Sequence, residues 1–316
     1  MIKVELHGRL GNQLFQYAAA RLIREKTGQE ILISLRTIEN EKDKEGGKGW
    51  EDSLRYFNVT PYKTYREKLP LMFYKSSVLQ IALMLSYYLS YKFFLEKHPY
   101  DFAGLKRRQL KWAPILNRFG VWWLKQGYYK YECNYLGNYF LNGGFESPGY
   151  FDEIRSILLK EFTLKSSLDD EQKKTQEYLD NCESICISIR KFDLMDDERE
   201  KIYKVCDEDY FHKAINIMTE RLEQPVFYVC SNDTDWVKEH FDFNSAKVVY
   251  ENGLDAPQVK LMIMAKCKHF IISNSTFSWW AQYLGTYKEK KVIAPRRWYN
   301  LEFDSPLLED KRWIYI

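Results

Sequence analysis

Hydrophobic positions along the chain alternate between short β-branched runs and longer stretches where apolar residues recur every three or four positions. At the start, IKVEL (2–6), a helical pattern over 14–28 and EILISL (30–35) predict a strand–helix–strand unit. The same alternation resumes later, with helices predicted over 209–223, 256–268 and 276–287. The later strands are predicted at SICISI (184–189), PVFYVCS (225–231), AKVVY (246–250), HFIIS (269–273) and KVIAP (291–295).

Alternating strands and helices are typical of parallel sheets with a right-handed crossover between strands. Two such stretches predict an α/β fold of two doubly wound domains with a ligand cleft between them. We place the domains at 1–165 and 175–316, joined by the polar linker SSLDDEQKK (166–174). The aromatic segment 65–145 is predicted to be mostly helical, an insertion in the first domain.

Residues 76–91 form an uncharged run of sixteen residues, which is too short for a typical membrane span. One interpretation is a helix buried in the first domain. The other is a peripheral membrane surface, because the basic group Lys106, Arg107 and Arg108 follows, with many aromatic residues after it.

The cysteines and the net charge limit the class of protein. Six cysteines are spread singly without a CxxC pair, which favours a reduced, cytosolic protein with buried thiols. The net charge of +3 is balanced along most of the chain and gives no reason to expect a nucleic-acid partner. No secretion signal is recognised at the N-terminus.

Polar clusters follow three of the predicted strands. After the first strand, Gly11, Asn12 and Gln13 precede a helix, where glycine lets a ligand approach the backbone and the helix N-terminus favours anions. A tight turn explains these residues equally well. After a later strand, Asn274, Ser275, Thr276, Phe277 and Ser278 offer hydroxyl and backbone N–H groups suited to phosphate. Simple helix capping is the alternative there.

The strand SICISI ends directly in Arg190-Lys191-Phe192-Asp193. The planar guanidinium of an arginine at this position suits a diphosphate, and Asp193 would orient it or act as a base. A solvated salt bridge is the alternative. The acidic triplet that begins at Asp233 could hold a divalent ion, but it also resembles the start of a helix, where acids are favourable.

Taken together, these clusters resemble glycosyltransferase family 11, the α-1,2-fucosyltransferases. The family's opening G-G-L-G-N-Q-M-F-Q-Y-A is similar to residues 8–18, and its F-S-D-D-x-x-W to residues 230–236. Its L-M-S-x-C-K-H-x-I-I-A-N-S-S-F-S-W-W resembles residues 263–280, and a late I-A-P-x-x-W returns at 293–298. The segment 143–162 also matches a family stretch.

The resemblance implies a GT-B-like fold, with two Rossmann-like domains facing across a cleft, and inversion at the anomeric carbon without metal or cofactor. It implies an acceptor-side first domain and a nucleotide-sugar-binding second domain. In the family's H-x-R-R-x-D signature the first arginine grips the donor diphosphate, and here it is Arg190. Ser275, Thr276 and Phe277 would hold the same phosphates, and Asp193 is the candidate base.

The sequence departs from the family's pattern at several positions. Ser188 replaces the histidine of the signature, Lys191 the second arginine and Phe192 the glycine, while Asn232 replaces an aspartate. Lys260 stands where the family has an acid. Because a lysine donates hydrogen bonds only, it would suit the carbonyl oxygens of uracil or thymine better than the N–H groups of guanine. Gln258 or Asp255 would compensate.

The expected function is a hexosyltransferase reaction from a nucleotide-sugar donor, by family GDP-fucose, to a glycan or lipid-linked oligosaccharide acceptor in surface polysaccharide synthesis. The same reaction with a UDP- or dTDP-sugar is the first alternative, and an inactive glycan-binding relative is the second. The expected location is the cytoplasm, with peripheral contact at the inner face of the membrane as an extension.

Overall fold

The computed structural model describes the chain except for residues 45–48, 100, 126, 192–196, 301–307 and 309. The chain divides into two compact units, the first spanning Met1–Phe162 and the second beginning at Thr163. The prediction of a linker over 166–174 is partly wrong, because helix α6 (Asp170–Asn181) begins inside this segment. Asp169 starts that helix by accepting a hydrogen bond from the Gln172 N–H, in a capping box.

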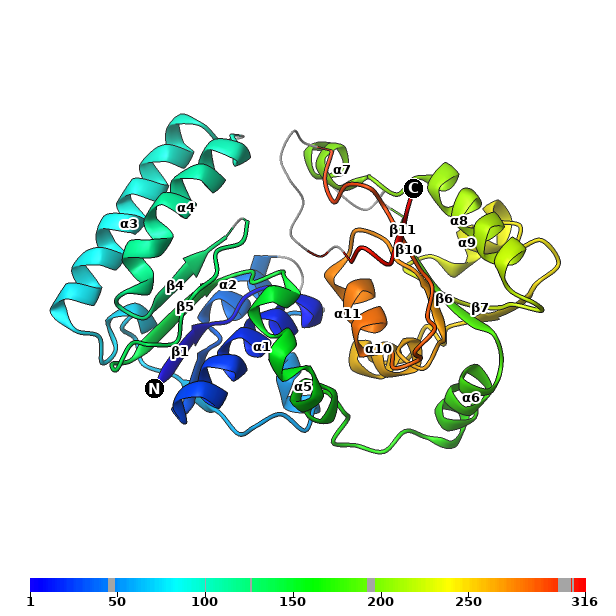
Figure 1. Cartoon of the computed structure of the whole chain (residues 1–316), viewed down its shortest axis with the longest axis horizontal. Coiled ribbons are helices and arrows are strands. Elements are labelled where there is room, and N and C mark those ends of the chain that lie inside the picture. The colour runs from blue at the N-terminus through cyan, green and yellow to red at the C-terminus, as the bar shows by residue number, and fades with distance from the viewer. Residues whose placement is uncertain (45–48, 100, 126, 192–196, 301–307, 309) are drawn as a thin grey trace. The chain divides into compact units, whose positions relative to one another are not determined.

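Unit 1 is built on a parallel sheet of five strands in the order β3-β2-β1-β5-β4 (Figure 1). Its strands are β1 (Ile2–Glu5), β2 (Ile31–Ser34), β3 (Lys63–Tyr65), β4 (Val121–Leu124) and β5 (Tyr139–Gly143). Its helices are α1 (Leu10–Thr27), α2 (Arg36–Lys44), α3 (Val78–Lys97), α4 (Phe102–Asn117) and α5 (Arg155–Glu161). Figure 1 shows α3 and α4 running side by side.

Two of these strands correct the expectation of a mostly helical middle segment. VWWL forms β4 and YFLNG forms β5, and β5 pairs directly with β1, the first strand of the chain. Both strands are short and aromatic, and all four residues of β4 are buried. A fully buried short strand shows no polar alternation, so periodicity alone does not separate it from a helix.

One face of this sheet packs against α3 and α4. Met84 and Tyr87 of α3 are fully buried there beside Leu116 of α4 and Phe140 of β5. Lys3 also points to this face, where its ammonium donates to the Tyr74 carbonyl at 2.9 Å. Burial lowers the pKa of Lys3 to about 8.

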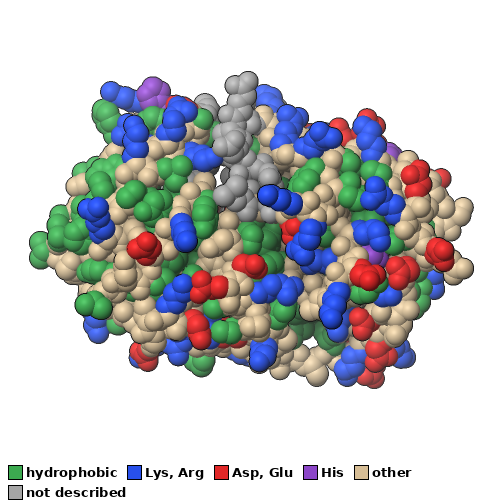
Figure 2. Space-filling model, in the orientation of Figure 1, with side chains coloured by type: hydrophobic (Ala, Val, Ile, Leu, Met, Phe, Trp, Pro, Cys, Tyr) green, Lys and Arg blue, Asp and Glu red, His purple; other side chains and the backbone are tan. Residues whose placement is uncertain are grey.

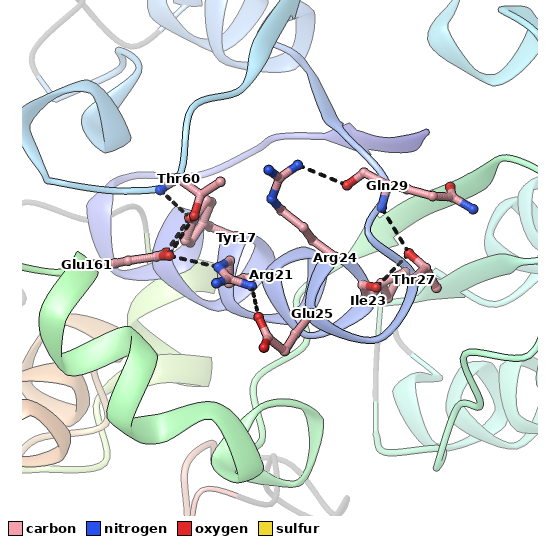
Figure 3. A network of polar contacts seen from close by, with 9 residues as sticks. All are labelled: Tyr17, Arg21, Ile23, Arg24, Glu25, Thr27, Gln29, Thr60 and Glu161. Carbon is pink, nitrogen blue, oxygen red and sulfur yellow. Dashed lines mark hydrogen bonds and ion pairs between the residues drawn. The ribbon is translucent and has the colours of Figure 1, made fainter.

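A buried polar network connects α1 and α5 of unit 1 (Figure 3). The carboxylate of Glu161, at the end of α5, accepts hydrogen bonds from Tyr17, Arg21 and Thr60. Arg21 Nε lies 2.8 Å from Glu161 Oε1, and the Thr60 hydroxyl lies 2.7 Å from the same oxygen. The network joins α1, which supplies Tyr17 and Arg21, to α5 and to the segment before β3, which supplies Thr60.

Unit 2 holds a second parallel sheet, of six strands in the order β11-β10-β9-β6-β7-β8. Its strands are β6 (Ser184–Ile189), β7 (Val226–Ser231), β8 (Lys247–Tyr250), β9 (His269–Ile271), β10 (Val292–Ala294) and β11 (Ile314–Tyr315). After α6, its helices are α7 (Asp197–Tyr203), α8 (Glu208–Arg221), α9 (Thr234–His240), α10 (Pro257–Met264) and α11 (Thr276–Leu284). The strands and helices predicted from the sequence in this half are confirmed.

Candidate active site

In unit 2 the order of the strands marks one place for a ligand. From β6 the chain moves to β7 and β8 on one side, and β9 is later added on the other side of β6. The loops after β6 and β9 therefore leave in opposite directions. In open α/β sheets ligands bind at such a switch point, beyond the carboxyl ends of the strands.

The structure brings two of the predicted clusters to this switch point. Ile187 of β6 pairs with Ile271 of β9. Three residues further on, Arg190 follows β6 and Asn274 follows β9, on neighbouring strands that lie about 5 Å apart. The sequence gives no sign that the two clusters are neighbours, because 84 positions separate Arg190 from Asn274.

The hydroxyl block that begins at Ser275 is the N-terminus of α11. Ser275 caps this helix, with its Oγ accepting from the Phe277 N–H at 3.3 Å. Thr276 and Phe277 are half-buried, and no acid lies in the first turn. No carboxylate of this turn neutralises the positive end of the helix dipole, which suits an anion.

The two residues that flank this cap have side chains occupied within the protein. Asn274 donates from Nδ2 to the carbonyl oxygens of Tyr203, at 2.8 Å, and Trp298, at 3.0 Å. Ser278 is 1% exposed, and its hydroxyl donates within the same turn, 3.0 Å from the Ser275 carbonyl oxygen. Their predicted contacts with the donor stay predictions, and the structure gives both a positioning role.

Arg190 is exposed and lines a cavity of about 420 Å³ in unit 2. The wall of the cavity combines the end of β6 with α7, the start of α8 and one aromatic side chain of α9. Its lining residues include Arg190, Lys191, Lys204, Asp207, Phe211 and Trp236. The volume lies within the range of small-molecule sites, and the wall offers cations, acids and aromatic surface together.

Lys191 and Asp233 form an ion pair across the ends of β6 and β7, with Nζ 2.9 Å from Oδ2. Asp233 also caps α9 by accepting from the Trp236 N–H at 3.0 Å. The hydrogen bonds from Trp236 and Lys191 lower the pKa of Asp233. Asp233 is thus a helix cap held by a lysine, the arrangement that the sequence offered as the alternative to a metal site.

Asn232, the departure next to Asp233, exchanges two hydrogen bonds with the backbone of Lys191. Its Oδ1 accepts from the Lys191 N–H at 2.8 Å, and its Nδ2 donates to the Lys191 carbonyl at 3.0 Å. Ser188 is half-buried in β6, opposite Cys230 of β7. Asp193 and Phe192 lie outside the described residues, so the candidate base stays a prediction.

The structure gives Lys260 a partner within the protein, and its predicted contact with the nucleotide base stays a prediction. Its Nζ lies 3.0 Å from Oε2 of Glu251, whose side chain is only 5% exposed. Glu251 Oε1 accepts from the Ser231 N–H at the end of β7. Desolvation raises the pKa of Glu251, and the lysine partly opposes this shift. The Lys260 ammonium thus balances the charge of a buried carboxylate. Asp255, the suggested substitute, accepts from Gln172 at 2.7 Å.

Unit 1 has its own switch point, between β1 and β5. The loop after β1 has Gly8 at a φ of +75°, where an added Cβ would lie 2.4 Å from the Asn12 amide. Gly11 is buried in the first turn of α1. Gln13 is fully buried, and its amide bonds to the backbone of Gly8, Glu51 and Ser53. These contacts shape the loop, and the donor-binding role of Gly11, Asn12 and Gln13 stays a prediction.

Sequence reasoning missed the polar side chains gathered at this second switch point. Gln16, fully buried, donates to the Nδ1 of His7, so His7 Nε2 carries the proton and donates to the Gly143 carbonyl at 3.0 Å. Burial lowers the pKa of His7 to about 3. Just beyond β5, burial raises the pKa of Glu146 to about 7. The sequence signal that could have found Glu146 is a single acid in GGFES (143–147), with no basic residue beside it.

Phe145 next to Glu146 has a φ of +52°, which is rare for a bulky residue. Such backbone is kept only where the surroundings fix it, and the Phe145 ring packs against Trp122 and Tyr150.

Within the described part of the chain, no group of three or more His, Cys, Asp or Glu is arranged to hold a metal ion.

Two parallel sheets in one chain, with an arginine and a helix N-terminus at the switch point of unit 2, form the arrangement expected of a GT-B-like glycosyltransferase. The sequence model of glycosyl transferase family 11 matches residues 122–316. The chain belongs to this family, and it is a glycosyltransferase.

Curated relatives extend the similarity. The O-antigen biosynthesis glycosyltransferase WbnK of Escherichia coli is 26% identical over 329 aligned positions, covering 98% of each chain. An alpha-1,2-colitosyltransferase of Escherichia coli is 31% identical over 165 positions, which cover 51% of this chain and 56% of that one. The chain thus spans nearly all of the first relative and about half of the second.

Among solved structures, NodZ alpha-1,6-fucosyltransferase co-crystallised with GDP is similar at 11% identity and a TM-score of 0.48. That comparison covers 89% of this chain and 91% of NodZ. At this similarity we infer nothing further from it.

Proposed function

We propose that this enzyme transfers a sugar, by family L-fucose from GDP-fucose, to a hydroxyl of a glycan acceptor in surface polysaccharide synthesis. The observation that supports the proposal is that β6, which leads into Arg190, and β9, which leads into α11, are neighbouring strands at one switch point. Full-length similarity to an O-antigen glycosyltransferase supports the polysaccharide context.

The proposed reaction is a single displacement that inverts the anomeric carbon. The acceptor oxygen forms a bond to that carbon while the bond to the diphosphate breaks, and the nucleoside diphosphate leaves. Negative charge grows on the leaving phosphate oxygens. The guanidinium of Arg190 and the positive N-terminal end of α11 would stabilise it without a metal ion.

A base must accept the proton of the acceptor hydroxyl. Asp193 remains the candidate from the family signature. Among the described residues we add Glu146, because a carboxyl with a pKa of about 7 exchanges protons best near neutral pH. Its position beyond β5, at the switch point of unit 1, fits the acceptor-side role expected for this unit.

The alternative donors differ in the nucleotide base that the protein must recognise. The expectation of a UDP- or dTDP-sugar rested on Lys260 as a hydrogen-bond donor to the nucleotide base. The ion pair with Glu251 gives this lysine another role, because its charge is balanced inside the protein. We therefore keep GDP-fucose as the donor.

The test is a calorimetric titration with GDP, UDP and dTDP in metal-free buffer, for the wild type and for Arg190→Ala. We expect GDP to bind the wild type and its affinity to fall about 100-fold in the variant, since a charge-assisted contact to phosphate is lost. Arg221→Ala is the matched control, because Arg221 is equally exposed but ends α8 at the opposite edge of the sheet.

The other outcomes point to the alternatives. Preferential binding of UDP or dTDP would replace the donor but keep the reaction. Binding of no nucleotide, together with a glycan affinity that Arg190→Ala leaves unchanged, would indicate an inactive glycan-binding relative.

A further inference from the structure

Helix α3 of unit 1 is apolar on both of its sides. It runs from Val78 to Lys97, and its first charged residue is Lys92. Among the described residues it is the one helix long and apolar enough to cross a membrane, yet only 17% of its most apolar window is buried. An all-round apolar helix is normally covered on every side. The interpretation of 76–91 as a buried helix is therefore wrong.

One side of α3 is fixed to the body of unit 1. Gln80 is 1% exposed and donates from Nε2 to the carbonyl oxygens of Phe119, at 2.6 Å, and Asn138, at 2.8 Å. Met84 and Tyr87, one and two turns further on, are fully buried. Because these contacts hold the helix against the sheet, α3 cannot span a bilayer in the folded protein.

The opposite side of α3 presents large apolar side chains to solvent. Val78, Leu85 and Leu89 follow one another at helical spacing, and the stripe continues to Phe93. Their exposed fractions are 84% for Val78, 52% for Leu79, 38% for Leu85, 62% for Leu89 and 58% for Phe93. An apolar patch of this kind on a soluble protein marks an interaction surface.

The segment that carries this stripe is rich in cations. Residues 75–118 contain eight Lys and Arg against two acids, while the whole chain has a net charge of only +3, so the remainder is net negative. The exposed positions Arg107, Lys111 and Arg118 line one side of α4, the helix that packs beside α3. Figure 2 shows hydrophobic side chains with Lys and Arg between them over the part of unit 1 that holds α3 and α4.

We propose that the exposed stripe of α3, with the cations of α4, docks on an anionic phospholipid bilayer, the helix lying in the plane of the headgroups. Apolar residues on one helix side with surrounding Lys and Arg are what an interfacial helix needs. The charge decides between occupants, because two copies of this surface would bring like charges together, whereas anionic headgroups attract them. If the proposed function holds, the acceptor would be a glycan carried on a membrane lipid.

The experiment is co-flotation of the full-length protein with vesicles of phosphatidylethanolamine and phosphatidylglycerol, and separately of phosphatidylcholine alone. We expect binding to the anionic vesicles only, weakening as salt rises from about 0.1 M to about 0.5 M. The variant V78Q/L85Q/L89Q should lose at least about tenfold in partitioning. R107Q/K111Q/R118Q should lose about fivefold for each cation removed.

The matched control is L136Q/L254Q, which removes two leucines that are 99% and 94% exposed outside α3 and α4. It should bind vesicles as the wild type does. Circular dichroism checks that each variant keeps the wild-type melting temperature. If V78Q/L85Q/L89Q has a lower melting temperature than the wild type, the proposal is judged on R107Q/K111Q/R118Q and on the salt dependence of vesicle binding.

The proposal is overturned if the wild type ignores anionic vesicles, or if both α3 and α4 variants bind them unchanged. It is also overturned if sedimentation shows a wild-type dimer that V78Q/L85Q/L89Q dissociates, since the surface would then join two copies. Vesicle binding needs no turnover, so its failure and that of the proposed function remain distinguishable.

Discussion

Lys260 Nζ lies 3.0 Å from Glu251 Oε2, joining α10 to the residue that follows β8 at the carboxyl edge of the second sheet. The carboxylate also accepts from the backbone of Ser231, so one buried acid ties together three segments of unit 2. Lys260, which the sequence suggested as a determinant of nucleotide specificity, is therefore first of all the partner of the buried Glu251 carboxylate.

Lys260→Met should destabilise the protein rather than change its nucleotide preference. It leaves Glu251 buried without its cation, which costs about 2–4 kcal/mol, toward the lower range for a broken buried pair because Lys260 keeps some exposure. Urea unfolding measures the loss. The double variant K260M/E251Q should recover most of it. A switch of calorimetric preference from GDP to another nucleotide in K260M would return Lys260 to the base-binding role.

Glu146→Gln should lower turnover by about 100-fold and remove the pKa near 7 from the rate profile. Turnover that rises with pH through about 7 in the wild type is the expected signature of a base that must be ionised. If the variant keeps the wild-type rate and profile, Glu146 does not accept the proton, and Asp193→Asn becomes the next variant to measure.

The same glutamate predicts a pH dependence of stability. Its pKa in the folded state, about 7, exceeds the ordinary 4.5, so the folded state holds the proton more tightly between these values. The free energy of unfolding should therefore fall as pH rises from about 5 to about 7. Glu146→Gln should lose that slope and be roughly 1–3 kcal/mol more stable than the wild type at about pH 8. An unchanged slope would contradict this origin.

Glu161→Ala should cost about 2–4 kcal/mol of unfolding free energy, because it leaves buried Arg21 without one of its carboxylate partners and Tyr17 without an acceptor. The measurement is chemical denaturation of the full chain. Glu153→Ala is the control, since its pair with Lys26 is 59% and 42% exposed and should contribute within about 0.5 kcal/mol. Equal losses in the two variants would contradict a special role for the network.

Transfer should proceed at the same rate in excess EDTA as in its absence. Asp233 caps a helix and pairs with Lys191, and Arg190 with the N-terminus of α11 would supply the charge that a metal ion supplies elsewhere. The check is an initial-rate assay with and without the chelator, with Asp233→Asn beside the wild type. Activity that is lost with EDTA and restored by manganese would refute the metal-free mechanism.

The sequence by itself determined five strands and three helices of unit 2, because the hydrophobic pattern of each of these segments shows which residues are buried. It also determined that Arg190 and the Ser275 cap stand at strand ends, and that the chain belongs to its family. These are local properties of the chain, and neighbouring residues suffice to specify them.

Only the tertiary structure decided which partner each polar side chain has and which side of a helix meets water. Nothing near Lys260 in the sequence shows that Glu251 is buried beneath it. Likewise α3 is apolar all round, so its periodicity carries no information about which side faces the core. Those outcomes depend on strands and helices brought together from distant parts of the chain, and burial there changes what a charge or an apolar side chain needs.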